Sequence, residues 1–138
     1  MIFQTTEQVR FSQVDAAGIV FYPRFLDMVN NLVEDWFAQA LQYPFQDMHP
    51  LYGVPTVDLQ VQFKKPARLG EVLTKKLWVA TLKQSSVQLH IAFENTQAET
   101  VLTAQVVLVY VHFDPHTHQA QSTPFPEALR HLILPYEH

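Results

Sequence analysis

The chain has 138 residues, of which 48% are apolar and 16% are charged, which is typical of a folded protein and excludes intrinsic disorder. At this length we expect a single domain that spans residues 1–138. The net charge of −4 argues against nucleic acid as a partner, and the absence of cysteine excludes disulfides, thiolate nucleophiles and cysteine-ligated metal sites.

The amino-terminal half predicts one short strand followed by one long helix. Thr5 to Phe11 alternates apolar with polar residues and is predicted to be a strand. From Pro23 to Leu41 the apolar residues recur at three- and four-residue steps, which predicts a helix with one wide buried stripe. Pro23 suits the first turn of that helix, where a missing N–H costs nothing. The width of the stripe indicates that a sheet wraps around the helix.

The rest of the chain is predicted to be mostly strand. A loop covers Tyr43 to Gly53, and a short helix covers Glu127 to Leu134. The apolar run within the last predicted strand indicates burial on both faces. The four strands between the loop and the short helix are predicted at residues 57–64, 72–82, 86–95 and 100–113. The predicted class is therefore α+β, with one long helix packed on a five-stranded antiparallel sheet.

The connection between the first strand and the long helix carries the candidate chemistry. Asp15 and Gly18 stand in this connection with two alanines between them, and the helix begins shortly afterwards. Gly18 permits backbone conformations that other residues resist, and small side chains let a ligand approach the backbone. The unpaired N–H groups at a helix start can hold a carbonyl oxygen as it becomes negative. Asp15 also has a purely structural interpretation, as a cap of the helix or of a turn.

The run from Asp15 to Pro23, Asp-Ala-Ala-Gly-Ile-Val-Phe-Tyr-Pro, resembles the signature of the 4-hydroxybenzoyl-CoA thioesterase family of hotdog proteins. Pro55, the stretch from Phe63 to Glu71 and the Ser85-Ser86 pair also resemble that family's order of motifs. Together these motifs cover most of the chain, from about Thr6 to Phe113. The resemblance implies the hotdog fold and the hydrolysis of an acyl-CoA thioester to free acid and CoA.

The resemblance also implies roles for individual residues. Asp15 would attack the thioester carbonyl or activate a water molecule, and the two routes remain open. The backbone N–H of Tyr22 would polarise the carbonyl oxygen, and Gly18 would allow the thioester to approach closely. The aromatic side chains of Phe21, Tyr22, Phe25 and Trp36 are compatible with an aromatic or a medium aliphatic acyl chain, although each is equally explained as part of the core.

Two further sets of residues are implied as substrate contacts. Asn30 occupies a helix position where relatives differ with the acyl group, and its neutral amide would bind a polar acyl substituent. Cations and hydroxyls at strand ends, where relatives bring CoA to the surface, would bind the phosphates of CoA. These residues are Lys65, Lys83, Ser85 and Ser86, together with Lys64 and Arg68. A solvated strand edge is the alternative interpretation for each of them.

Neither a cofactor nor a metal is predicted, because the histidines near Asp114 lack a recognised ligand spacing. The low charged fraction and an exposed sheet edge favour a homodimer or homotetramer. A cytoplasmic location without a membrane span is expected, since no apolar segment is long enough to cross a bilayer. The alternatives are a non-catalytic module that binds acyl-thioesters and, ranked last, a hotdog dehydratase or hydratase, because no histidine precedes Asp47.

Overall fold

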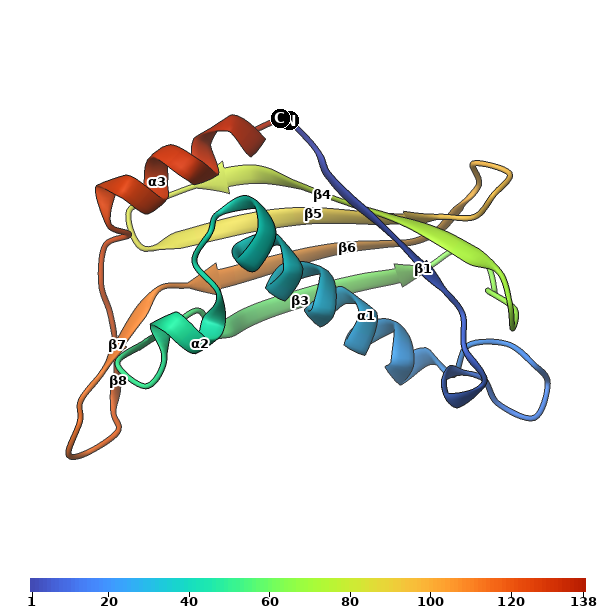
Figure 1. Ribbon diagram of the computed structural model, residues 1–138, viewed down its shortest axis with the longest axis horizontal. Helices are drawn as coiled ribbons and strands as arrows, with labels where there is room; N and C mark the ends of the chain where they lie inside the picture. Colours follow the sequence, from blue (N-terminus) through green and yellow to red (C-terminus); the bar gives the residue numbers. More distant parts are fainter.

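One long helix crosses one face of a five-stranded antiparallel sheet (Figure 1). The computed structural model describes residues 1–138. Hydrogen-bonded neighbours in the sheet follow the order β1, β4, β5, β6, β3. The bounds are β1 Phe3–Gln8, β3 Thr56–Phe63, β4 Val72–Leu82, β5 Ser86–Glu94 and β6 Thr100–Val109. The predicted α+β arrangement is therefore confirmed.

The long helix consists of α1 (Tyr22–Asp35) and a π-helical segment, Trp36–Ala40, that continues it. The helix begins one residue before the predicted start, so Pro23 occupies the second helical position, where no N–H is needed. The side chains that form the predicted stripe are buried against the sheet. They are Phe25, Met28, Val29, Leu32, Val33, Trp36 and Phe37.

The strands of the main sheet bury one face each. Along β5 every second residue from Val87 to Phe93 is buried, and the residues between them are half-buried. The same alternation holds along most of β6, where Val107 and Val109 are only half-buried. The prediction that this strand is buried on both faces is therefore wrong for the chain itself. The sequence suggested two buried faces because valine occurs on both faces of this strand, whereas only one of the faces is buried.

A second, three-stranded sheet interrupts the predicted order at the end of the molecule where α1 finishes (Figure 1). Its strands are β2 (Tyr52–Gly53), β7 (Val111–Phe113) and β8 (Ala120–Ser122). The predicted final strand therefore divides at Tyr110, whose ring stacks on Tyr52 with the two centroids 5.4 Å apart. The predicted loop contains β2 and a short helix, α2 (Phe45–Met48).

The two ends of the chain differ from prediction by only a few residues. β1 ends at Gln8 instead of Phe11, and Phe11–Gln13 form a 3₁₀ turn. The carboxy-terminal helix α3 covers Glu127–Ile133, which confirms the predicted short helix. None of the helices combines the length and the apolar character that crossing a membrane would need.

The core between α1 and the sheet should dominate stability. Replacing Leu32 with alanine is expected to lower the free energy of unfolding by about 2–5 kcal/mol, because its side chain is fully buried beneath the sheet. Urea unfolding followed by circular dichroism measures this loss. Asn31→Ala is the matched control, since Asn31 is exposed on the same helix and its loss should stay within about 0.5 kcal/mol. Equal losses for the two variants would contradict this account of the core.

The edge strand β3 exposes apolar side chains. Val57, Leu59 and Phe63 are 60%, 43% and 49% exposed, respectively. On one side β3 pairs with β6, and on the other it has no partner strand in the chain. An open, apolar strand edge is the kind of surface that proteins usually cover.

Candidate active site

A small hairpin carries Asp15 and leads directly into α1. Its base is held by a hydrogen bond from the Phe21 N–H to the Gln13 carbonyl, at 2.9 Å. Nearer the tip, the Asp15 N–H donates to the Ile19 carbonyl at 2.9 Å. The Gly18 N–H donates to the Asp15 carbonyl at 3.0 Å, with Gly18 at a φ of +77°. That left-handed conformation is the one predicted for Gly18 to permit, and it closes the tip of the hairpin.

The Asp15 side chain lies exposed on this tip. One carboxylate oxygen, Oδ1, accepts a hydrogen bond from the Ala17 N–H at 2.9 Å. The second oxygen has no hydrogen-bond partner in the chain. Asp15 therefore stabilises its own turn, as the structural interpretation of the sequence expects. It also presents one oriented, unshared oxygen that is available for chemistry.

The start of α1 supplies a free hydrogen-bond donor. The Tyr22 N–H, at the first helical position, has no acceptor within the chain, and Pro23 has no N–H at all. The next donor, the Arg24 N–H, is used by the Phe21 carbonyl at 2.8 Å. Because the aligned peptide dipoles of α1 make this end positive, the Tyr22 N–H is suited to a developing negative charge on an oxygen.

The segment before β4 holds the hairpin from the other side. Ile19 forms an isolated β-bridge with Arg68. The Val20 N–H donates to the Ala67 carbonyl at 2.9 Å, and the Leu69 N–H donates to the Gly18 carbonyl at 3.0 Å. Arg68 thus stands beside the hairpin with an exposed side chain and no ion-pair partner within the chain. Of the six residues predicted to bind CoA phosphates, Arg68 is the one that lies beside the hairpin, held there by the backbone hydrogen bonds of its neighbours Ala67 and Leu69.

Aromatic rings surround the start of α1. Phe21 and Tyr22 are exposed, with ring centroids 5.6 Å apart, and Tyr22 meets Phe63 of β3 at 6.1 Å. Phe25 is buried and packs between Phe63 and Phe93 at 5.9 and 6.4 Å. Phe25 is therefore part of the core in this chain, whereas Phe21 and Tyr22 present ring surface to solvent.

An apolar groove of about 160 Å³ follows the seam between α1 and β3. It starts at Leu26, one helical turn after Tyr22, and extends to Phe45 of α2. Asn30 and Thr56 supply its only polar side chains, on opposite sides of the seam. The groove is smaller than pockets that hold whole drug-sized ligands.

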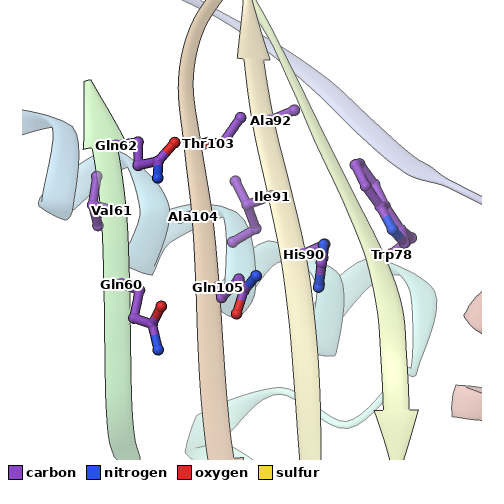
Figure 2. Close-up of a pocket in the computed structure, with 10 residues that line it drawn as sticks. All are labelled: Gln60, Val61, Gln62, Trp78, His90, Ile91, Ala92, Thr103, Ala104 and Gln105. Atoms are coloured by element: carbon purple, nitrogen blue, oxygen red, sulfur yellow. The ribbon is translucent and has the colours of Figure 1, made fainter. Parts of the chain in front are cut away.

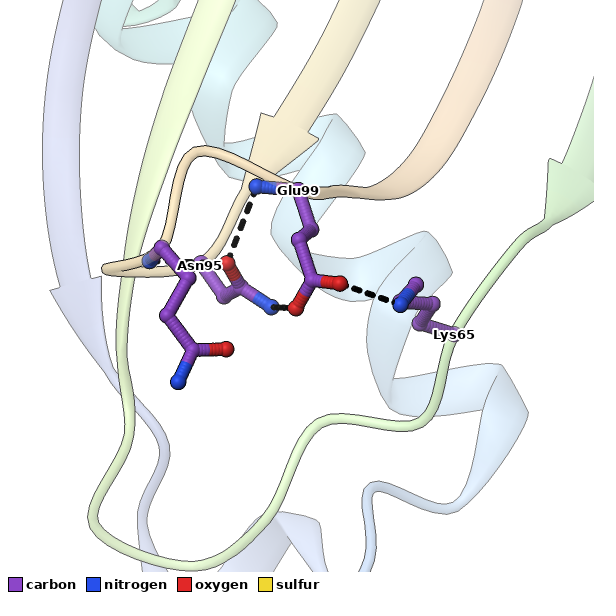
Figure 3. Close-up of polar contacts among 4 residues, drawn as sticks. Lys65, Asn95 and Glu99 are labelled. Carbon is purple, nitrogen blue, oxygen red and sulfur yellow. Dashed lines mark hydrogen bonds and ion pairs between the residues drawn. The ribbon is translucent and has the colours of Figure 1, made fainter.

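The remaining residues predicted to bind CoA lie in two different places. Lys65, at the end of β3, forms an ion pair with Glu99, which also accepts a hydrogen bond from Asn95 (Figure 3). These hydrogen bonds hold the pKa of the exposed Glu99 carboxyl below its ordinary value. The side chain of Lys65 is thus shared with Glu99 before any phosphate binds.

Lys83, Ser85 and Ser86 stand at the turn between β4 and β5, beside α3, at the opposite end of the sheet from the hairpin (Figure 1). Eleven residues of β4 separate this turn from the hairpin end, which corresponds to roughly 33 Å of extended strand. Within one chain these three residues therefore do not meet Asp15.

The outer face of the sheet carries a separate hollow of about 390 Å³ (Figure 2). Glutamines from β3 and β6 line it together with Trp78 and His90, whose rings lie 5.8 Å apart. Figure 2 shows α1 behind the strands, on the far side of the sheet from these side chains. The hollow contains no carboxylate and is separated from Asp15 by the sheet, so it is not part of the candidate active site.

A partly buried ion pair lies under the hairpin. Lys75, on the inner face of β4, donates to Glu7 Oε1 at 2.7 Å, and its side chain is almost fully buried. Gln13 Nε2 donates to the other oxygen, Glu7 Oε2, at 2.8 Å. These three residues were not among the candidates predicted from the sequence. A lysine between Leu73 and Leu77, at an inward position of an alternating strand, was the signal that could have found them.

The ion pair predicts a specific loss of stability in acid. Burial raises the pKa of Glu7. The hydrogen bonds from Lys75 and Gln13 and the charge of Lys75 together lower this pKa by more than burial raises it, so the net pKa lies below the ordinary value of 4.5. A carboxyl whose pKa is depressed by folding stabilises the fold above its unfolded pKa, and this contribution is lost as the pH falls through the folded pKa. The free energy of unfolding should therefore decrease as the pH falls below about 4.5.

Urea unfolding of the wild type and of Glu7→Gln, at pH 7 and at several values below pH 4.5, measures this contribution. The variant should lose less stability than the wild type over the same pH interval. Glu99 remains in both proteins, so the difference between the two curves isolates Glu7. Parallel curves would show that Glu7 is not stabilised by its partners.

The chain matches the model of a known family and several solved structures. Residues 9–133 match the thioesterase-like superfamily. A 1,4-dihydroxy-2-naphthoyl-CoA hydrolase from Acaryochloris marina is 25% identical over 120 residues, which cover 86% of this chain and 88% of the relative.

Two solved structures share the fold. A 1,4-dihydroxy-2-naphthoyl-CoA thioesterase from Synechocystis superposes with a TM-score of 0.85 at 20% identity, covering 97% of this chain and 96% of its own. An aspartate-to-asparagine mutant of 4-hydroxybenzoyl-CoA thioesterase, complexed with 4-hydroxybenzoyl-CoA, superposes with a TM-score of 0.86 at 18% identity. It covers 96% of this chain and 98% of its own.

These matches confirm the predicted hotdog fold and, at the level of the family, the predicted thioesterase function. The narrower assignment to 4-hydroxybenzoyl-CoA thioesterases stays a prediction, because that enzyme is similar in structure alone. Since the family model covers nearly the whole chain, the protein belongs to the thioesterase-like superfamily.

Proposed function

We propose that this protein hydrolyses acyl-CoA thioesters, with Asp15 and the Tyr22 N–H as its catalytic groups. One observation supports this assignment above the others. A short hairpin, closed at its base by the Gln13 and Phe21 backbones, joins an unshared carboxylate oxygen to an unpaired helix-start N–H. The names of the relatives as CoA thioester hydrolases agree with it.

The chemistry follows from what each group offers. The Tyr22 N–H would donate to the thioester carbonyl oxygen as it becomes negative. The Asp15 carboxylate would either add to the carbonyl carbon, forming an anhydride that water then cleaves, or remove a proton from the attacking water. In both routes the C–S bond breaks, the CoA thiolate leaves and takes up a proton, and water supplies the oxygen of the product acid.

The acyl group is proposed to be aromatic. The exposed rings of Phe21 and Tyr22 and the apolar groove between α1 and β3 suit a planar, apolar group. Asn30 and Thr56 give the groove a neutral amide and a hydroxyl, which can bind ring hydroxyls without supplying a charge. Relatives named for 1,4-dihydroxy-2-naphthoyl-CoA make that ester the first substrate to test.

The active form is proposed to be a homodimer, or a tetramer built from dimers, that pairs the open edges of β3. The exposed Val57, Leu59 and Phe63 give this edge an apolar surface. Two antiparallel β3 edges related by a two-fold axis would bring the opposite ends of the two sheets together. Lys83, Ser85 and Ser86 of the second copy would then lie at the end of the sheet that carries Asp15.

A thiol-trapping assay with aromatic, short-chain and long-chain acyl-CoAs tests the proposed function. Release of CoA with a preference for aromatic esters is the expected result. Tight binding of the esters without release of thiol would instead favour the alternative of a non-catalytic acyl-thioester binding module, in which Asp15 only closes its turn. One hotdog domain over residues 1–138, a site without cofactor and a cytoplasmic location remain predictions.

A further inference from the structure

A chain of hydrogen bonds connects the interior of the sheet to the base of the hairpin. We name Lys75, Glu7 and Gln13 the strut. Lys75 Nζ donates to one oxygen of Glu7 at 2.7 Å, and Gln13 Nε2 donates to the other at 2.8 Å. The three residues come from β4, β1 and the 3₁₀ turn before the hairpin. The strut therefore fixes the turn to two strands at once.

The strut ends on the backbone that carries the candidate catalytic groups. Gln13 Oε1 accepts the Arg10 N–H at 2.8 Å, while the Gln13 N–H donates to the Arg10 carbonyl at 3.0 Å. The Gln13 carbonyl accepts the Phe21 N–H, and Phe21 directly precedes Tyr22. Asp15 follows Gln13 by two residues. A shift of Gln13 would therefore move Asp15 and the Tyr22 N–H relative to each other.

The energetics of the strut favour a role in orientation. Lys75 is 3% exposed and is the only charged residue in the buried core. Removing an ammonium and a carboxylate from water costs about as much as their attraction returns, so such a pair adds little net stability compared with apolar residues. Its hydrogen bonds nevertheless have strict directions, and they leave Gln13 one position in which all its partners are satisfied.

We propose that the strut positions the active site by holding Asp15 and the Tyr22 N–H at the separation that thioester hydrolysis requires. This inference rests on the proposed function. None of the three side chains touches the substrate: Lys75 and Glu7 act through Gln13, and Gln13 acts through the hairpin backbone. Catalysis depends steeply on such positioning, since misplacement of a group by about 1 Å costs on the order of a hundredfold in rate.

The same region offers a matched control. Lys76, the next residue of β4, forms an ion pair with Glu94 at 2.9 Å on the outer face of the sheet. This pair joins β4 to β5 and makes no contact with the hairpin. Lys76→Met therefore removes an ion pair of similar geometry without affecting Gln13.

The decisive variant is Gln13→Met, which keeps the length of the side chain and removes its donor and its acceptor. With an aromatic acyl-CoA we expect kcat to fall about 10- to 100-fold, with KM changed less than threefold. In hydrogen–deuterium exchange, peptides from residues 14–22 should exchange faster, while those of β5 and β6 stay protected. Lys76→Met should leave kcat and the exchange of residues 14–22 unchanged.

A pair of substitutions supplies a rescue. Gln13→Glu alone faces Glu7 with a second carboxylate and should lower kcat as Gln13→Met does. Adding Glu7→Gln restores all three hydrogen bonds and reverses only the one between positions 7 and 13: Lys75 donates to the new glutamine, whose amide donates to the new glutamate, which accepts the Arg10 N–H. The double variant should return kcat to within about threefold of the wild type.

The outcomes distinguish a failure of the proposed positioning role of the strut from a failure of the proposed function. A wild type that releases no thiol from any ester would defeat the proposed function, while faster exchange in Gln13→Met would still establish that the strut orders the hairpin. Unchanged kcat and unchanged exchange in Gln13→Met would overturn the inference. So would a Gln13→Met variant whose kcat falls only in proportion to a lowered melting temperature and is not recovered by the rescue.

Discussion

Asp15→Asn should lower kcat for acyl-CoA hydrolysis by about 10²- to 10⁴-fold while leaving the fold intact. The amide keeps an oxygen that can accept the Ala17 N–H, so the turn survives. It cannot act as a nucleophile or take a proton from water, so both proposed routes fail. Steady-state thiol release measures the loss, and thermal unfolding should give a melting temperature within a few degrees of the wild type, because Asp15 is exposed.

Asp114→Asn is the matched control for this loss. Asp114 is also an exposed aspartate that closes a turn, accepting the His116 and Thr117 N–H groups at 2.8 and 2.9 Å. It lies after β7, at the end of the molecule away from the hairpin (Figure 1). Its substitution should leave kcat unchanged. Equal activity of the wild type and Asp15→Asn would reduce Asp15 to its turn-closing role.

Leu59→Lys should convert the protein from a dimer into a monomer. Leu59 lies in the middle of β3, and a lysine there would meet its own symmetry copy across the paired edges, where like charges repel. Light scattering after size exclusion measures the result as a mass near the 16.0 kDa of one chain. We also expect kcat/KM to fall at least about tenfold, because part of the CoA rim is proposed to come from the second copy.

Leu132→Lys makes the same chemical change at a similarly exposed leucine, 40% exposed on α3, and should leave the mass unchanged. Leu59 also lines the acyl groove, so the mass, and not the activity, decides this prediction. A wild type that is monomeric at micromolar concentrations and fully active would contradict the proposed assembly. A dimer that persists in Leu59→Lys would place the interface elsewhere.

The sequence predicted well those elements whose position follows from the local spacing of apolar residues. The long helix appears within one residue of its predicted start because its apolar spacing and Pro23 act over a few turns. The joint action of Asp15 and the Tyr22 N–H stays a prediction, although the hairpin between them is closed as a turn there would require. The pattern of neighbouring residues carried that information.

The features that the sequence did not predict depend on contacts between distant residues. Tyr52 and Tyr110 stack across 58 positions and help divide the last strand, which no local pattern records. Lys75 meets Glu7 across 68 positions. Arg68 was one of six equivalent candidates until its bridge to Ile19 placed it beside the hairpin. Lys83 and Asp15 are also far apart within one chain, because β4 runs the length of the sheet between them.

A crystal structure of Asp15→Asn with an unhydrolysed aromatic acyl-CoA would show whether Asp15 and the Tyr22 N–H both face the thioester. We expect the thioester carbonyl oxygen to lie about 2.7–3.1 Å from the Tyr22 nitrogen, with the side chain at position 15 facing the carbonyl carbon. The acyl ring should lie in the groove lined by Asn30 and Thr56. A thioester bound in the outer hollow beside Trp78, or with its carbonyl turned away from the start of α1, would show that the Asp15 hairpin is not the active site.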